Sequence, residues 1–214
     1  EAFGDKPDST LSAANDSSLL QAAETAIEEA PVALSAGEDA ESTLMYSIDE
    51  DGNAAITGTT DEKTKRGIVI PESIDGHPVT AIAEYAFSGK TPHSDYDLSD
   101  RTDLWLTSIY IPNSVKSIGG FAFMNNKNLE SVHLPENGCT IGHKDHWGEV
   151  YGSIFDGCIS LKTIAIPSGL NIMDGTYRGA YISALSAPKL ESVTFAEGTS
   201  AICKGFLANC PTLK

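Results

Sequence analysis

The chain has 214 residues, with 30 Asp and Glu against 14 Lys and Arg, so its formal net charge at pH 7 is −16. Such an acidic balance disfavours nucleic acid as a partner, because binding to phosphates needs a basic face. The chain has no run of the roughly 18 apolar residues that a membrane-spanning helix requires, so we expect no membrane insertion. Its four cysteines are too few for a disulfide scaffold.

The acidic residues are concentrated at the start of the chain. Residues 1–62 contain 15 acids and a single base, Lys6, whereas residues 63–214 contain 15 acids and 13 bases. Residues 1–43 are therefore interpreted as an acidic leader, with one candidate helix that ends at Pro31. Because the first residue is Glu rather than Met and no signal segment is present, we expect a processed or trimmed chain.

Residues 44–57 are predicted to form a β-hairpin. Leu44, Tyr46 and Ile48 alternate with more polar neighbours, an acidic turn ends at Gly52, and a second apolar run reaches Ile56. This hairpin opens the second predicted domain, residues 44–214.

The turn of this hairpin also invites a calcium-loop interpretation. Asp49, Asp51 and Asn53 could offer oxygen ligands. However, an EF-hand loop needs Gly at its sixth position and Glu at its twelfth, and these positions hold Ala54 and Thr60. A simple turn is the favoured interpretation.

From about residue 65 the sequence repeats, and five units can be aligned. Each begins with a pattern close to L-x-x-I-x-I-P, and from Leu106 onward the opening leucines are 23, 32, 29 and 23 residues apart. A basic unit of 23 residues with insertions accounts for these spacings, and Leu213 starts a sixth unit at which the array stops. The first segments of the five units are residues 65–71, 106–112, 129–135, 161–167 and 190–196.

Each first segment is followed by a second short apolar run. Its pattern is V-x-x-I-G-x-x-A-F, and three residues further on stands Asn126, Cys158 or Cys210. The first segment turns two alternating branched residues inward from a short strand, and the proline after it turns the chain away. One such coil cannot bury its apolar residues alone, so coils must stack and share a continuous core, which predicts a solenoid.

This unit resembles the BspA-like leucine-rich repeats, often called the fifth leucine-rich repeat family. Their consensus is close to L-x-x-I-x-I-P-x-S-V-x-x-I-G-x-x-A-F-x-x-C-x-x-L, and the resemblance covers residues 44–214. It implies a leucine-rich repeat solenoid, a right-handed stack of short parallel β-strands joined by turns and irregular or short helical segments. The hairpin would cap the N-terminal end, behind the acidic leader. Three departures occur: inserts in the third and fourth units, Ala184 at an expected Phe, and Ala196 at an expected Pro.

The resemblance also implies a function. BspA-like arrays occur largely on bacterial cell surfaces, where members are linked to adhesion to host matrix or other cells, and they carry no catalytic residues as a family. We therefore expect a secreted or cell-surface protein, monomeric and without cofactor, that binds a host or bacterial surface protein or a glycan. The alternative is a structural spacer that displays another module and has no ligand of its own.

The sequence contains few motifs that are typical of catalytic or metal sites. The sequence has no G-x-S-x-G, G-x-G-x-x-G, P-loop or H-E-x-x-H motif, so no catalytic residue is predicted. His143, Asp145, His146 and Glu149 lie close together in the insert of the third unit. Nothing fixes their geometry, so an exposed polar insert is favoured and no metal site is predicted.

The four cysteines are predicted to be free and mostly buried. Cys139 and Cys158 belong to the third unit, and Cys203 and Cys210 to the fifth. Stacked strands lie about 4.8 Å apart, so equivalent positions two units away are about 10 Å apart, beyond the roughly 7 Å Cα limit for a disulfide. Within a unit, a bridge would pull a corner through the core.

Two surfaces are candidates for binding. The strands should present a column of hydroxyls, at Ser108, Ser131, Thr163 and Ser192, beside a column formed by Tyr110, His133, Ala165 and Thr194. The inserts of the third and fourth units fall at comparable places in adjacent coils, so we expect the two loops to lie side by side. They carry aromatic and forked side chains of the types that dominate binding hot spots. The alternative is that these aromatic side chains only pack the loops onto the core. We predict that the ligand-binding residues are Trp147, Tyr151, Tyr177, Arg178 and Tyr181.

Overall fold

The computed structural model describes residues 43–60, 66–88, 106–144, 150–151, 154–172, 174–177, 180–183, 187–199 and 210–214. All of them belong to one compact unit, Leu34–Lys214. The predicted helix of the leader, and the leader itself up to residue 42, lie outside the described residues. In the described part, no helix is long and apolar enough to cross a membrane.

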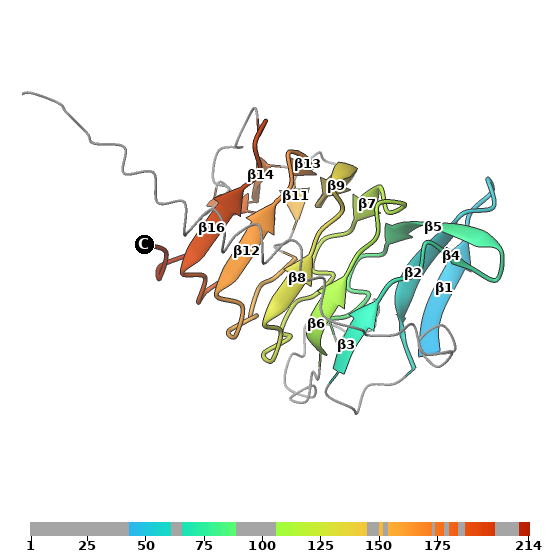
Figure 1. Cartoon of the computed structure of the whole chain (residues 1–214), viewed down its shortest axis with the longest axis horizontal. Helices are drawn as coiled ribbons and strands as arrows, with labels where there is room; N and C mark the ends of the chain where they lie inside the picture. Colours follow the sequence, from blue (N-terminus) through green and yellow to red (C-terminus); the bar gives the residue numbers. More distant parts are fainter. Residues whose placement is uncertain are drawn as a thin grey trace, which may run out of the picture. The chain divides into compact units, whose positions relative to one another are not determined.

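The first segments of the five repeat units form a row of short parallel strands (Figure 1). Strand β3 (Arg66–Val69) pairs with β6 (Leu106–Tyr110), and β6 pairs with β8 (Ser131–His133). Strand β12 (Thr163–Ile166) pairs with β16 (Ser192–Phe195), and β8 contacts β12. Each unit thus places its strand beside the strand of the preceding unit, as a leucine-rich repeat solenoid requires.

The second apolar runs form a separate parallel sheet. Its parallel order is β2 (Ala54–Thr59), β5 (His77–Ile82), β7 (Ser117–Ile118), β9 (Asn137–Ile141) and β13 (Gly169–Ile172). The predicted hairpin is present at its N-terminal edge, where β1 (Leu44–Ile48) pairs antiparallel with β2. A short strand, β4 (Ser73–Ile74), also pairs antiparallel with β5.

The inserts of the third and fourth units form two small antiparallel pairs. Strand β10 (His143–Lys144) pairs with β11 (Val150–Tyr151), and β14 (Asp174–Tyr177) pairs with β15 (Ala180–Ser183). The insert that precedes the second unit, residues 89–105, lies outside the described residues.

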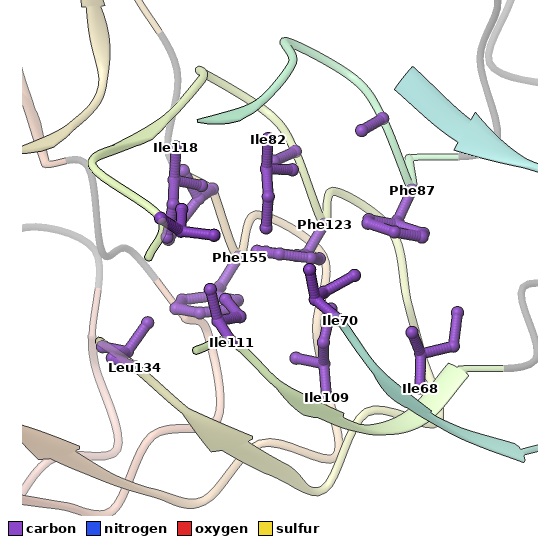
Figure 2. Packing of buried hydrophobic residues seen from close by; sticks show 14 of the residues in the cluster. Ile68, Ile70, Ile82, Phe87, Ile109, Ile111, Ile118, Phe123, Leu134 and Phe155 are labelled. Carbon is purple, nitrogen blue, oxygen red and sulfur yellow. The ribbon is translucent and has the colours of Figure 1, made fainter. Parts of the chain in front are cut away.

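The core lies between the two strand layers and is continuous from unit to unit. Figure 2 shows the isoleucines of both layers directed toward phenylalanine rings between them. Phe87, Phe123 and Phe155 stack in order, with ring centroids 5.7 Å and 5.6 Å apart. Phe123 and Phe155 are fully buried. The A-F position of the repeat therefore builds an aromatic column that joins successive units.

The Asn or Cys that follows this phenylalanine links each unit to the preceding one. The side-chain Nδ2 of Asn126 donates hydrogen bonds to the carbonyl oxygens of Phe87 and Phe123, both at 2.9 Å. In the next unit the Sγ of Cys158 donates to the Phe123 carbonyl oxygen at 3.2 Å. These buried groups satisfy backbone oxygens at a corner where no sheet partner is available.

Glycine at the I-G position lets neighbouring units approach closely. A Cβ atom placed on Gly119 would lie 2.5 Å from the backbone nitrogen of Glu84 in the preceding unit. A side chain of any size would therefore push the two units apart, which explains why the repeat uses glycine at this position.

The turn of the hairpin is organised by Asp49. Its Oδ1 accepts hydrogen bonds from the backbone nitrogens of Asp51 (3.0 Å) and Asn53 (2.8 Å), and its Oδ2 accepts one from Nδ2 of Asn53 (3.1 Å). These bonds, the backbone bond from Asn53 first, hold the pKa of Asp49 below its ordinary value. The carboxylate is used by its own turn, in agreement with the turn interpretation.

Candidate binding surfaces

The predicted hydroxyl column of the first sheet is in register. Ser108 lies opposite Ser131, and Thr163 lies opposite Ser192. Gly67 precedes Ser108 in the same column. Ser131, Thr163 and Ser192 are exposed, and none of these hydroxyls forms a side-chain hydrogen bond within the described part of the chain. No described residue therefore competes with water or with a ligand for these hydroxyls.

The neighbouring column contains a stacked pair of rings. Tyr110 lies opposite His133, with ring centroids 4.3 Å apart and an angle of 5° between the ring planes. Both side chains are half-buried. Further along the column, Ala165 lies opposite Thr194, and both are exposed. We call the two columns together the strand face.

The stacked position of His133 changes its protonation. Burial lowers its pKa below the ordinary value of 6.5, and the nearby charge of Glu136 acts in the opposite direction with a smaller effect. The imidazole of His133 is therefore neutral at pH 7.

We expect the free energy of unfolding to decrease as the pH falls below about 6.5. Between the lowered pKa in the folded chain and the ordinary pKa in the unfolded chain, only the unfolded state binds the proton, so stability rises with pH in this window and levels off above it. Urea unfolding from about pH 5 to pH 8 would measure this dependence. The His133→Phe variant should have a flatter profile, and an unchanged slope would show that His133 is not the responsible group.

Charged residues border the strand face at the start of the strands. Glu130 and Lys162 are exposed, and Glu191 is half-buried. Lys162 and Glu191 are neighbours in adjacent units, because the backbone N–H of Glu191 donates a hydrogen bond to the Lys162 carbonyl oxygen at 2.7 Å. The side chains of Lys162 and Glu191 form an exposed ion pair of 3.9 Å, which contributes little stability.

The inserts of the third and fourth units lie side by side at their strands, because β11 contacts β14. In the fourth-unit pair, Thr176 lies opposite Tyr181 and Tyr177 lies opposite Ala180. Trp147 and Arg178 lie outside the described residues, as do the side chains of Tyr151, Tyr177 and Tyr181. We call the surface formed by these five predicted residues the insert face.

A second stacked pair was missed by the sequence reasoning. Tyr85 and Phe121 stack with centroids 5.0 Å apart, and both are half-buried. Their φ angles are 59° and 57°, in the left-handed region that bulky residues rarely adopt. Each stands two residues before the buried phenylalanine of its unit, so a column-by-column reading of that repeat position could have revealed the pair.

The described cysteines agree with the prediction of free thiols. Cys139 and Cys158 are free and buried, and Cys210 is free and half-buried, whereas Cys203 lies outside the described residues. Burial raises the pKa of Cys139 to about 11 and that of Cys158 to about 12. Such thiols are almost entirely protonated at neutral pH and therefore unreactive.

Thiol titration tests this assignment. In denaturant without reductant, we expect four reactive thiols per chain, one for each cysteine. In the folded protein, Cys139 and Cys158 should react only as fast as the chain opens, because burial keeps both thiols protonated and keeps the reagent away from them. A count of two or zero in denaturant would mean that disulfides exist and that the repeat register is mistaken.

No group of three metal-ligating side chains occurs among the described residues. The side chains of His143, Asp145, His146 and Glu149 lie outside the described part of the chain.

The repeat pattern and the stacked strands are matched by a known family. The model described as BspA type leucine-rich repeat region matches residues 100–214, in six copies. The chain belongs to the BspA-type leucine-rich repeat family. As the resemblance implied, this family is non-catalytic, and its members generally have binding and adhesive roles.

Solved structures of bacterial leucine-rich repeat proteins share the fold. One from Bacteroides capillosus is 27% identical with a TM-score of 0.51, and the match covers 72% of this chain and 94% of that one. The T. pallidum leucine-rich repeat protein is 23% identical (TM-score 0.51; coverage 80% and 78%). One from Bacteroides ovatus is 22% identical (TM-score 0.51; coverage 80% and 45%). No curated protein sequence matches the chain.

Proposed function

We propose that this chain is a secreted or cell-surface protein that binds a partner protein or glycan through the insert face, without catalysis. The observation that carries the proposal is the contact between β11 and β14, which brings the inserts of two neighbouring units together. Binding through a surface built from two units is typical of solenoids, in which per-repeat insertions gather on one side.

The composition of the inserts supports the same surface. Large interfaces are dominated by a few Trp, Tyr and Arg side chains, and the two inserts supply Trp147, Tyr177 and Arg178, together with two further tyrosines. Membership of a family with binding and adhesive roles supports an extracellular location and a partner on a host or bacterial surface. We expect the chain to act as a monomer.

The test is binding of the whole chain to immobilised matrix proteins and surface glycans. Trp147→Ala and Tyr177→Ala should each weaken binding about tenfold or more, because each removes a hot-spot side chain. Ile159→Ala is the matched control, since Ile159 is a large apolar side chain that is 48% exposed outside the inserts. Circular dichroism would confirm that the variants are folded.

Three outcomes separate the alternatives. Loss of binding in the insert variants alone supports the insert face. If a ligand is found and both folded variants bind it unchanged, the insert face is wrong. If no matrix protein or glycan binds the wild-type chain, the structural spacer replaces binding as the function.

A further inference from the structure

The strand face carries no charged side chain, although the chain as a whole is strongly acidic. Its described outward positions, taken along both columns from β3 to β16, are Gly67, Val69, Ser108, Tyr110, Ser131, His133, Thr163, Ala165, Ser192 and Thr194. Six of these ten side chains bear a hydroxyl group. The face is therefore flat, neutral and rich in hydrogen-bonding groups.

The absence of charge is a property of these columns and not of the strands in general. Glu130, Lys162 and Glu191 stand one residue before the hydroxyl column in three units. A soluble surface is best built with about 25–35% charged residues of both signs, interspersed with other polar ones. An uncharged centre with a charged border is instead the composition of a surface that loses its water on binding, because charges are costly to desolvate.

The stacked rings define where a ligand would make apolar contact. One face of the His133 ring lies against Tyr110. The next residue of this column is Ala165. Strand β12 contacts β8, and the repeat aligns the two segments so that Ser131 corresponds to Thr163 and Pro135 to Pro167. Ala165 is exposed, and a single methyl group covers little of an imidazole ring. Within the part of the chain that the structure describes, the second face of His133 is thus left for a ligand ring.

We propose that the strand face binds a neutral polysaccharide. A sugar ring stacks on the free face of His133 above Ala165, and its hydroxyls exchange hydrogen bonds with the hydroxyl column at Ser131 and Thr163. Aromatic stacking with several hydroxyl contacts suits a ring that is apolar on its faces and polar at its edges. The proposal goes beyond the insert face, since it uses a different surface and needs none of the insert residues.

The charges of the protein favour a neutral polymer over an anionic one. Residues 63–214, which contain the repeat units, have 15 acids and 13 bases and so no excess of positive charge, and the strand face offers no cation that could bind a sulfate or carboxylate group. A protein partner fits less well, because the centre of a protein interface is rich in large aromatic and apolar side chains, and among the described outward positions Tyr110 is accompanied only by the smaller Val69 and Ala165.

Electrophoresis of the whole chain in native gels tests the proposal. The gels contain dextran, mannan, galactan or xylan, with dextran sulfate as the anionic comparison. We expect at least one neutral polymer to retard the wild-type chain, and dextran sulfate not to. His133→Ala should raise the apparent dissociation constant about tenfold, whereas His133→Phe, which keeps a ring, should preserve most of the retardation.

Two lysine substitutions at exposed positions distinguish loss of polysaccharide binding from loss of the fold. Ala165→Lys places a long charged side chain beside His133 and should abolish retardation. Ser117→Lys makes the same change at an exposed strand position of the second sheet, on β7, and should leave retardation unchanged. Both positions point to solvent, so neither variant is expected to lose the fold.

The outcomes also separate this proposal from the insert face. Retardation that is lost in Ala165→Lys but kept in Trp147→Ala supports the strand face, whatever the inserts bind. Retardation that is lost in Trp147→Ala and unchanged in Ala165→Lys overturns the strand-face proposal and leaves the insert face standing. Absence of retardation by all four neutral polymers, or stronger retardation by dextran sulfate, also overturns it.

Discussion

Replacing Phe123 with alanine is expected to lower the free energy of unfolding by about 3–5 kcal/mol. Phe123 is fully buried and is the middle ring of the column, in contact with Phe87 on one side and Phe155 on the other. Truncation removes both stacking contacts and leaves a cavity that the units cannot close, because the strands on either side fix their separation.

Urea unfolding monitored by circular dichroism measures this loss. Phe123→Leu is the matched control, since it keeps most of the apolar volume and should cost clearly less than the alanine variant. Because repeat proteins are coupled mainly to their neighbours, the alanine variant should also broaden the transition or split it at the second unit. A loss of less than about 1 kcal/mol would mean that the aromatic column does not hold the units together.

Replacing Asn126 with alanine is expected to cost about 2–3 kcal/mol. Asn126 is 1% exposed, and its Nδ2 is the only described donor to the Phe87 carbonyl oxygen. The alanine variant therefore removes the one donor to this oxygen that the described residues supply. The Phe123 carbonyl oxygen is less affected, since Cys158 also donates to it.

The Asn126→Cys variant distinguishes the hydrogen bond from simple packing. Cys158 occupies the equivalent position in the next unit, and its Sγ donates a hydrogen bond to the carbonyl oxygen of Phe123 in the preceding unit. The cysteine variant should therefore recover part of the stability that the alanine variant loses, as measured by urea unfolding. If the two variants are equally destabilised, the corner does not depend on a donor at this position.

The repeat, the strands of the first sheet and the composition of the core could all be predicted from the amino-acid sequence. A strand alternates its side chains with a period of two, so L-x-x-I-x-I placed Ile109 and Ile111 inward and Ser108 and Tyr110 outward without any tertiary information. The same repeat register predicted the hydroxyl column and the burial of Cys158, and it placed Asn126 at the position equivalent to Cys158. The N-terminal hairpin followed from alternation around an acidic turn.

Which rings stack on one another between units could be seen only in the folded chain. The stacking of Tyr110 on His133 and that of Tyr85 on Phe121 each join residues from different units. A repeat pattern assigns each residue to a column, but ring orientation and left-handed backbone depend on the side chains that happen to be neighbours in that column. The sequence did predict that the two inserts lie side by side, because they fall at comparable places in adjacent units, and the contact of β11 with β14 agrees with this. The antiparallel strand pair within each insert was not predicted, because an insert has no repeat register.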